Sequence, residues 1–233
     1  KKMNKMERVV TCLNHKEADR VPVYPVLSGV TRKLINVDYF TWANDARACA
    51  DALIKAADEF EQDCIVTLID LSIECEAWGQ KLIYPENEAA HPDYSDPVIK
   101  DIEDYKKISK IDWRNGRRMQ MHYDVCKILI EEKGGELPIV PFVFGPLGVL
   151  SMLRNQQDLY LDIYDEPEIV YEAAKNINET LKEYCADLAK LGAPAIMLDT
   201  LFASGSIMSK EMWKEMEGGL VSELSDVIRD NGS

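Results

Sequence analysis

The sequence is poor in positive charge. Its 27 lysine and arginine residues are outnumbered by 41 aspartate and glutamate residues, which gives a formal net charge of −14. A nucleic-acid partner needs a basic face, and an anionic membrane attracts basic segments. The charge balance therefore excludes both as expected partners, although it leaves room for a local basic pocket around a small anionic ligand.

Long apolar runs and secretion signals are also missing. No segment approaches the ~18 apolar residues that a membrane span needs, and the first 20 residues are too charged for the apolar core of a signal peptide. The six cysteines include no CxxC pair, and most lie in apolar segments, where a free cysteine acts as a small hydrophobic residue. We expect a cytoplasmic protein with reduced thiols.

Several familiar catalytic motifs are absent. No GxGxxG or GxxxxGK[ST] follows an apolar run, which removes the strongest sign of an open nucleotide-binding fold, and no GxSxG marks a serine hydrolase. His122 and Cys126 lie four residues apart and share a helix face, but a structural zinc site usually needs four ligands. A pair of residues flanking the core is the favoured interpretation, and no metal ligands are expected within this chain.

The sequence does contain four apolar runs of strand length, interleaved with segments of helical periodicity. The runs cover residues 21–27, 64–70, 137–145 and 195–199. They are apolar at successive positions, as in parallel strands that are covered on both faces. Strands that alternate with helices indicate a parallel sheet with right-handed crossovers.

The helical segments have apolar stripes and end signals. Helices are predicted near residues 45–60, in a segment that ends at Gly134, and in a segment that starts after Ser209. Residues 80–116 form a long excursion with three prolines and are expected to hold one short helix. The best-defined helix ends at Gly192 and has seven apolar residues on one face. These are Val170, Ala173, Ile177, Leu181, Tyr184, Leu188 and Leu191.

These elements fit an α/β fold of the (β/α)8 TIM-barrel type, although an open doubly wound sheet has the same alternation. A closed eight-stranded barrel needs roughly 250 residues, whereas this chain shows only about four to five β/α units. We therefore expect residues 1–233 to form a single barrel domain of which the C-terminal part is missing. We also expect this segment alone to be inactive.

Two carboxylates, Asp70 and Asp199, end apolar runs. Active sites of parallel α/β proteins lie at the carboxyl ends of strands. Both side chains are therefore expected at one mouth, where they could meet across a shared pocket. The alternative is that each caps the loop that follows it.

Other polar and small residues follow the same strand ends. Glu74 and Glu76, in DLSIECEAWG, are interpreted as a solvated helix start rather than as metal ligands, because acids suit the first helical turn. Gly145 and Gly148 flank Pro146 in a tight strand-to-helix turn. This turn either binds an anion at the helix N-terminus or only packs.

Three arginines are candidates for holding an anionic group. Arg20 and Arg32 flank the first apolar run, and Arg154 lies on the helix after the Gly-Pro turn. A guanidinium binds carboxylate or phosphate with two parallel hydrogen bonds. A surface charge without a ligand is the alternative for each of them.

The order and spacing of these segments resemble the uroporphyrinogen decarboxylase superfamily. MERVVTCLNHKEADRVPVYPVL is similar to its opening, a helix followed by Arg-Val-Pro-Val at the first strand. Residues 96–153 resemble its middle part, which ends in a Gly-Pro turn, and AIMLDTLFASGSIMSKEMWKEM is similar to its aspartate-bearing strand and Ser-Gly loop. The resemblance covers residues 3–233 and implies a (β/α) barrel with Asp199 at its mouth.

This superfamily contains porphyrinogen decarboxylases and corrinoid-linked methyltransferases. The decarboxylases carry an Arg-x-x-Gly-Arg-Tyr segment after the first strand to hold the substrate's carboxylates, whereas this chain reads VLSGVTRKLINVDYF there. A polycarboxylate substrate needs several fixed cations. The chain therefore resembles the methyltransferase branch more closely. Asp70 matches the position of the decarboxylases' pyrrole-binding aspartate, which does not separate the two branches.

The resemblance implies methyl transfer between a corrinoid protein and a small acceptor such as a thiol or a folate. The partner protein would carry methylcobalamin, and zinc, where it is used, would have ligands beyond residue 233. Catalytic roles are expected for Asp70 and Asp199. Uroporphyrinogen decarboxylation is the enzymatic alternative, and a non-catalytic half-barrel that binds a corrinoid protein or another chain is the other. The expected substrate contacts are Tyr24, Glu74, Phe144, Gly145 and Ser204.

Overall fold

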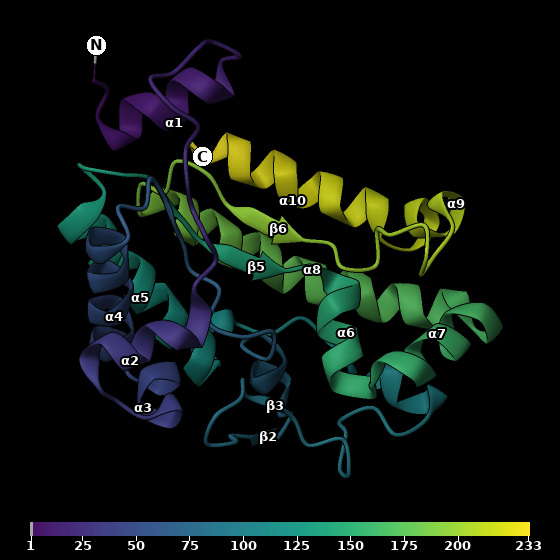
Figure 1. Ribbon diagram of the computed structural model, residues 1–233. Coiled ribbons are helices and arrows are strands. Elements are labelled where there is room, and N and C mark those ends of the chain that lie inside the picture. The colour runs from purple at the N-terminus through teal and green to yellow at the C-terminus, as the bar shows by residue number, and fades with distance from the viewer. Residues whose placement is uncertain (1) are drawn as a thin grey trace.

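The computed structural model describes residues 2–233 and shows an α/β fold built on short parallel strand pairs (Figure 1). Strand β1 pairs with β4 and β5 pairs with β6, and the α/β class predicted from the sequence is confirmed. In the second pair Phe144 lies opposite Asp199. The strands of these two parallel pairs are β1 (Ile65–Val66), β4 (Ile139–Val140), β5 (Phe142–Phe144) and β6 (Met197–Asp199).

Residues 139–144 form the centre of this arrangement, with a break at Pro141. Proline has no N–H to donate to a ladder, but the Pro141 carbonyl accepts a hydrogen bond from the Met197 amide at 2.8 Å. The Val140 carbonyl accepts from the Thr67 amide at 3.1 Å. Successive carbonyls of a strand point to opposite sides, so β1 and β6 flank the central strand.

The prediction of a strand over residues 21–27 was wrong, since this segment joins no ladder within residues 2–233. Pro22 and Pro25 remove two of the N–H donors that a central strand needs. The segment is fixed instead through Asp63, whose amide donates to the Val23 carbonyl at 2.7 Å. Several of its large apolar side chains remain exposed, namely Val21, Val23, Tyr24 and Val26.

Helices follow the predicted apolar stripes. The helix predicted near residues 45–60 is confirmed as α4, and those ending at Gly192 and starting after Ser209 are confirmed as α8 and α9. A π-helical turn, η5 (Lys214–Gly218), joins α9 to α10. The α-helices are α1 (Lys5–Leu13), α2 (Arg32–Ile35), α3 (Tyr39–Asn44), α4 (Ala46–Glu59), α5 (Arg117–Lys133), α6 (Pro146–Arg154), α7 (Gln156–Asp165), α8 (Pro167–Lys190), α9 (Lys210–Trp213) and α10 (Gly219–Asp230).

The two faces of the strands belong to different apolar clusters. Ile65 lies in the main core with the stripes of α4, α5 and α8, and α8 runs behind β5 and β6 in Figure 1. Val66 and Phe142 form a second, smaller cluster, against which Met197 packs. Because side chains alternate along a strand, Asp199 lies on the same face as Met197, away from the helices.

The excursion over residues 80–116 packs as part of the domain. Tyr105 and Trp113 are almost fully buried in the main core. The short helix expected there is present as η3, which is of the 3-10 type. The elements of the excursion are β2 (Leu82–Ile83), β3 (His91–Pro92), η3 (Ile102–Lys107) and η4 (Trp113–Asn115).

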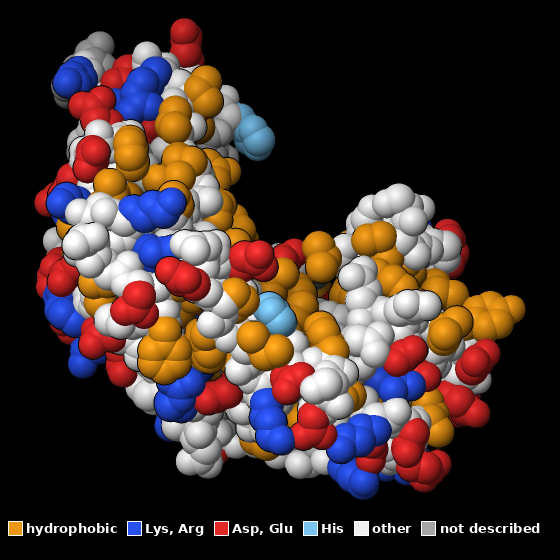
Figure 2. Space-filling view, turned by 60° about the horizontal axis from the view of Figure 1, so that its bottom comes forward, with side chains coloured by type: hydrophobic (Ala, Val, Ile, Leu, Met, Phe, Trp, Pro, Cys, Tyr) orange, Lys and Arg blue, Asp and Glu red, His pale blue; other side chains and the backbone are white. Residues whose placement is uncertain are grey.

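The surface is hollowed on one face, where hydrophobic side chains gather along the walls of the hollow (Figure 2). Leu201 and Ile207, in the loop after β6, are among the exposed large hydrophobic residues. None of the helices in residues 2–233 combines the length and the apolar character that crossing a membrane requires.

A buried ion-pair cluster ties the N-terminal residues to the start of β1. Asp63 is fully buried, and its two oxygens lie 2.6 Å from Nη1 of Arg8 and 2.5 Å from Nη1 of Arg20. The Val23 amide donates to the same carboxylate at 2.8 Å. Arg20 is thus held by Asp63 within the chain, and its role in binding an anionic ligand stays a prediction.

Removing the charge of Asp63 should destabilise the fold. Asp63→Asn weakens the contacts of Arg8 and Arg20, although Arg8 keeps its ion pair with Asp19 at 2.7 Å, and losing charge-assisted hydrogen bonds costs about 2 kcal/mol. Asp226→Asn is the matched control, because the Asp226–Arg229 pair is exposed and should cost under about 1 kcal/mol. Urea unfolding of both variants measures the difference, and equal losses would contradict the structural role of Asp63.

Candidate functional site

The carboxyl end of β5 is held by groups from other segments. The Phe144 amide donates to Oε1 of Glu74 at 2.9 Å, and the Gly145 amide donates to the Asp199 carbonyl at 2.9 Å. Glu74 immediately precedes the 3-10 segment η2 (Cys75–Trp78) and is only 3% exposed. Its interpretation as a solvated helix start was therefore wrong, because its carboxylate turns inward to the free amide at the strand end.

The turn after β5 is closed by Glu217 of η5. The Leu147 amide donates to Oε1 of Glu217 at 3.1 Å, and Nε1 of Trp213 donates to Oε2 at 2.8 Å. A Cβ on Gly145 would lie 2.8 Å from Oε1 of Glu217 and 2.9 Å from the Asp199 carbonyl, so the turn requires glycine. Anion binding was one of two interpretations of the N-terminus of α6, and the chain's own Glu217 carboxylate occupies this position.

Burial makes the carboxyl groups of Glu74 and Glu217 weaker acids than ordinary glutamates. Burial raises the pKa of Glu74 to about 7, although the hydrogen bond from the Phe144 amide lowers it in part. Burial also raises the pKa of Glu217, against the lowering effect of the hydrogen bonds from Trp213 and Leu147. Glu74 is therefore partly protonated at neutral pH, unlike a surface glutamate.

Asp199 is the most accessible of the acids at this strand end. It is half-buried, whereas Glu74 and Glu217 are almost fully buried. Burial raises the pKa of Asp199, and no hydrogen-bonding or ionic partner in the described part of the chain lowers it. Its carboxyl group is free to exchange a proton with a ligand.

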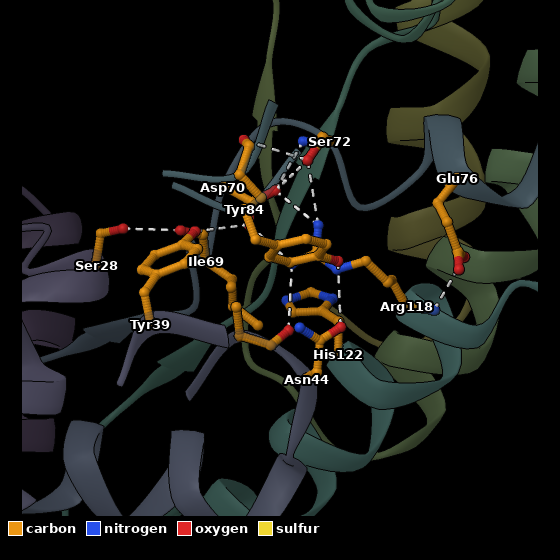
Figure 3. A network of polar contacts seen from close by, with 12 residues as sticks. Ser28, Tyr39, Asn44, Ile69, Asp70, Ser72, Glu76, Tyr84, Arg118 and His122 are labelled. Carbon is orange, nitrogen blue, oxygen red and sulfur yellow. Dashed lines mark hydrogen bonds and ion pairs between the residues drawn. The ribbon is translucent and has the colours of Figure 1, made fainter. Parts of the chain in front are cut away.

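Asp70 lies in a dense polar network (Figure 3). Arg118 donates from Nη1 and Nη2 to the two carboxylate oxygens, each at 2.8 Å. The Tyr39 hydroxyl donates to Oδ2 at 2.9 Å, and the Ser72 amide and hydroxyl donate to Oδ1 at 2.9 Å and 2.6 Å. The Arg118 guanidinium also lies 5.7 Å from the centroid of the Tyr84 ring.

Asp70 is therefore ionised and already engaged. Burial would raise its pKa, but the hydrogen bonds and charge of Arg118 outweigh burial and hold the pKa of Asp70 below its usual range. Asp70 lines a cavity of about 320 Å³, and Asp199 is not among the residues that line it. The expected meeting of the two carboxylates in one pocket is not observed there, because Asp70 turns toward Arg118 at the start of α5.

The other expected substrate contacts differ in accessibility. Tyr24 is 50% exposed on the segment before β1. The Phe144 ring is fully buried against Gly148, so only the backbone of Phe144 reaches the strand end. Ser204 is half-buried in the loop after β6, with its Oγ 2.9 Å from Oγ of Ser206. The structure thus gathers the expected residues Glu74, Gly145 and Asp199 at the end of β5.

His122 and Cys126 are buried core residues, as the sequence predicted. Nε2 of His122 lies 2.7 Å from Oγ1 of Thr67, and Nδ1 lies 2.5 Å from the Tyr184 hydroxyl. Burial lowers the pKa of His122 to about 4. Across residues 2–233, no group of three or more His, Cys, Asp or Glu side chains is placed to hold a metal ion.

The remaining candidate arginines differ from each other. Arg154 pairs with Asp162 at 2.8 Å and donates to the Lys100 carbonyl at 2.6 Å, so it is committed within the chain. Arg32 lines a separate surface cavity.

Arg118 and Glu217 were not identified from the sequence as residues of the candidate site, although the sequence position of each one indicates a buried partner. Arg118 lies in the first turn of α5, where the helix dipole disfavours a cation, so a carboxylate partner was to be expected. Glu217 lies four residues after Trp213 and therefore on the apolar face of its helix. An acid at such a position needs a buried partner.

The arrangement of parallel strands with acids at their carboxyl ends can be compared with known proteins. The family model described as "Uroporphyrinogen decarboxylase (URO-D)" matches residues 4–233. The chain belongs to the uroporphyrinogen decarboxylase family. The resemblance found in the order of its sequence segments is thereby confirmed.

Relatives from both branches of this family are similar to the chain. Uroporphyrinogen decarboxylase of Campylobacter jejuni is 20% identical over 198 residues, which are 82% of this chain and 56% of that protein. Methylcobamide:CoM methyltransferase MtbA of Methanosarcina acetivorans is 21% identical over 228 residues, 96% of this chain and 66% of that protein. The chain thus spans little more than half the length of the decarboxylases that it matches. The longer match agrees with placement nearer the methyltransferase branch.

A solved structure described as a methyltransferase from Methanosarcina mazei has the same fold. Its TM-score with this chain is 0.79 at 17% sequence identity, and the match covers 97% of this chain and 67% of that one. At this level of identity the likeness concerns the fold. It confirms the α/β fold over the matched 97% of this chain.

The raised pKa of Glu74 predicts a pH-dependent stability. Its pKa is about 7 in the folded protein against 4.5 for an ordinary glutamate, so folding is favoured when Glu74 is protonated. This contribution is complete below about pH 4.5 and is lost as the pH rises through about 7. Glu74→Gln keeps an acceptor for the Phe144 amide. Its free energy of unfolding relative to wild type should rise by roughly 2–3 kcal/mol between about pH 5 and pH 8.

Urea unfolding of wild type and Glu74→Gln across this pH range measures the effect. Glu76→Gln is the control, because Glu76 is partly exposed and pairs with Arg117 at 3.2 Å. The change with pH should be larger for Glu74→Gln than for this control. A constant difference for Glu74→Gln would show that Glu74 is not a neutral acid in the folded protein.

Proposed function

We propose that the whole protein is a methyltransferase that moves a methyl group between a corrinoid protein and a small acceptor such as a thiol or a folate. The similarity to MtbA over almost the entire chain supports this function. In this proposal the parallel strands belong to a (β/α)8 barrel, and the end of β5 lies in the barrel mouth, where such folds keep their active sites.

The observation that carries the proposal is the distribution of charge. Eight of the nine arginines lie within 4.0 Å of a carboxylate oxygen of the same chain, considering residues 2–233. The end of β5 carries the acids Glu74, Asp199 and Glu217 instead. A polycarboxylate substrate needs several free cations, whereas methylation of a thiol or amine needs a proton acceptor.

Asp199 is the proposed proton acceptor. The partner's methylcobalamin would supply the methyl group, and the electron pair of the broken methyl–cobalt bond would stay with the corrinoid. The sulfur or nitrogen of the acceptor would form the new bond to the methyl carbon, and the proton on that atom would pass to the carboxylate of Asp199. Burial raises the pKa of Asp199 and so makes its carboxylate a stronger base. Gly145 and Glu217 keep the turn beside it in place.

The hollowed face of the chain fits the large, mostly apolar macrocycle of a corrinoid that a partner protein carries. Exposed apolar side chains on a soluble surface mark contact sites when they cluster, and Figure 2 shows such side chains along the hollow. Across the described residues, the exposed large hydrophobic side chains include Val23, Tyr24 and Leu201. The described residues do not fit a zinc ion, because none of their His, Cys, Asp and Glu side chains form a three-ligand group. No step is assigned to zinc.

Decarboxylation is the second candidate, favoured by the similarity to the Campylobacter jejuni enzyme. In that case Asp70 and Asp199 would hold pyrrole N–H groups, but both oxygens of Asp70 already accept hydrogen bonds from Arg118. A non-catalytic half-barrel that binds a corrinoid protein or completes a barrel with another chain is a further alternative. We place the protein in the cytoplasm because its six cysteines are free and five of them are buried.

Asp199→Asn should abolish most methyl transfer. Loss of a general base lowers kcat/KM by about 10²-fold to 10⁴-fold, and the isosteric amide should leave folding intact, because Asp199 is half-buried. The assay uses the full-length protein, its methylated corrinoid partner and a thiol. Asp226→Asn, on the exposed surface of α10, is the control and should retain wild-type activity. Wild-type rates in Asp199→Asn would remove Asp199 from the mechanism.

A further inference from the structure

A cavity of about 740 Å³ lies at the opposite end of the strands from Glu74 and Asp199. Its walls come from the N-terminal segment with α1, from the end of α4 and from the residues that precede β4. Figure 1 shows α1 at the end from which β5 and β6 start, whereas α6 lies where they finish. This cavity is therefore separate from the candidate site.

Two arginines in the lining keep donors to spare. A guanidinium has five N–H donors. Arg8 is only 4% exposed and makes four hydrogen bonds, to Asp19, Asp63 and the Met3 carbonyl. Arg20 makes three. Within residues 2–233, one N–H group of Arg8 and two of Arg20 thus remain without an acceptor.

Two lysines extend this basic side of the cavity. Lys2 and Lys5 both line it, and neither has a carboxylate oxygen within 4.0 Å among the residues that the structure describes. Lys5 has one long contact, 3.5 Å from Nζ to the Ala57 carbonyl. Arg8, Arg20, Lys2 and Lys5 together form what we call the basic wall.

Acidic residues line the other side, and one of them lacks a partner. Asp58 and Glu136 pair with Lys133 at 2.9 Å and 3.0 Å. Glu61 is exposed and has no cation within 4.0 Å in the described part of the chain. Glu61 therefore supplies the available carboxylate of the lining.

The local backbone gives no reason for a glutamate at position 61. Its φ of 48° is left-handed, and the Gln62 amide donates to the Ala57 carbonyl at 3.0 Å, which is the end geometry of a helix that usually carries glycine. The negative end of the α4 dipole also disfavours an acid there. Residues that oppose their local structure are expected at functional sites.

We propose that this cavity binds an acidic amino acid, a small molecule with two carboxylates and one ammonium group. Its carboxylates accept hydrogen bonds from the lysines and the remaining guanidinium N–H groups of the basic wall. Its ammonium group pairs with Glu61. The ligand thus matches the unpartnered charges of the lining in sign. The site goes beyond the proposed function, because binding here does not depend on methyl transfer.

Calorimetric titration of the full-length protein with L-glutamate tests the proposal. Glutarate, which lacks the ammonium group, should bind about tenfold more weakly, as expected for the loss of one charge-assisted contact. Lys5→Gln should weaken the binding of both ligands by a similar factor. Glu61→Gly should weaken glutamate binding but not glutarate binding.

Glu61→Gly should also raise the Tm, because glycine suits the left-handed backbone at this helix end. This second measurement shows that weaker binding does not come from a damaged fold. Glu59→Gln and Lys16→Gln are the matched controls, since both residues are exposed and neither lines the cavity. Both controls should bind glutamate as wild type does.

Three results would overturn the proposal. They are the absence of binding heat at millimolar glutamate, equal affinity for glutamate and glutarate, and equal glutamate affinity in wild type, Lys5→Gln and Glu61→Gly. None of these results depends on turnover, so each is distinct from a failure of methyl transfer.

Discussion

The candidate site depends on the free backbone amides at the carboxyl end of β5. A parallel strand that ends at a helix leaves N–H groups without partners, and buried N–H groups must be satisfied. Here the oxygens come from Glu74, the Asp199 backbone and Glu217, which belong to three separate segments. The strand end thereby fixes the turn before η2, the end of β6 and the π-helical turn relative to one another.

The same requirement explains the chemistry of the site. Carboxylates recruited to cap buried amides leave water, and burial raises their pKa values. Asp199 uses only its backbone for this purpose, so its carboxyl group stays available on the face away from the helices. Asp70 differs from these acids. The hydrogen bonds and the charge of Arg118 offset the cost of its burial and keep its carboxylate ionised. Acids with different environments at neighbouring strand ends can serve different roles.

The sequence predicted what periodicity and end signals determine, namely α4, α8, the central strand and the position of Asp199 at a strand end. The predictions from the sequence were wrong where tertiary contacts override the local pattern of apolar and polar residues. Apolar composition alone suggested a strand at residues 21–27, but two prolines and the clamp of Asp63 prevented pairing. The burial of Glu74 and the pairing of Asp70 with Arg118 depend on residues distant in sequence, and no single segment contains that information.

The central claim is that this family member transfers methyl groups and does not decarboxylate porphyrinogens. One competition experiment tests it most directly. The full-length protein would receive uroporphyrinogen together with a methylated corrinoid protein and a thiol, while carbon dioxide and methylated thiol are measured in the same mixture. The account predicts methylated thiol without carbon dioxide. Release of carbon dioxide from uroporphyrinogen without methyl transfer would contradict it.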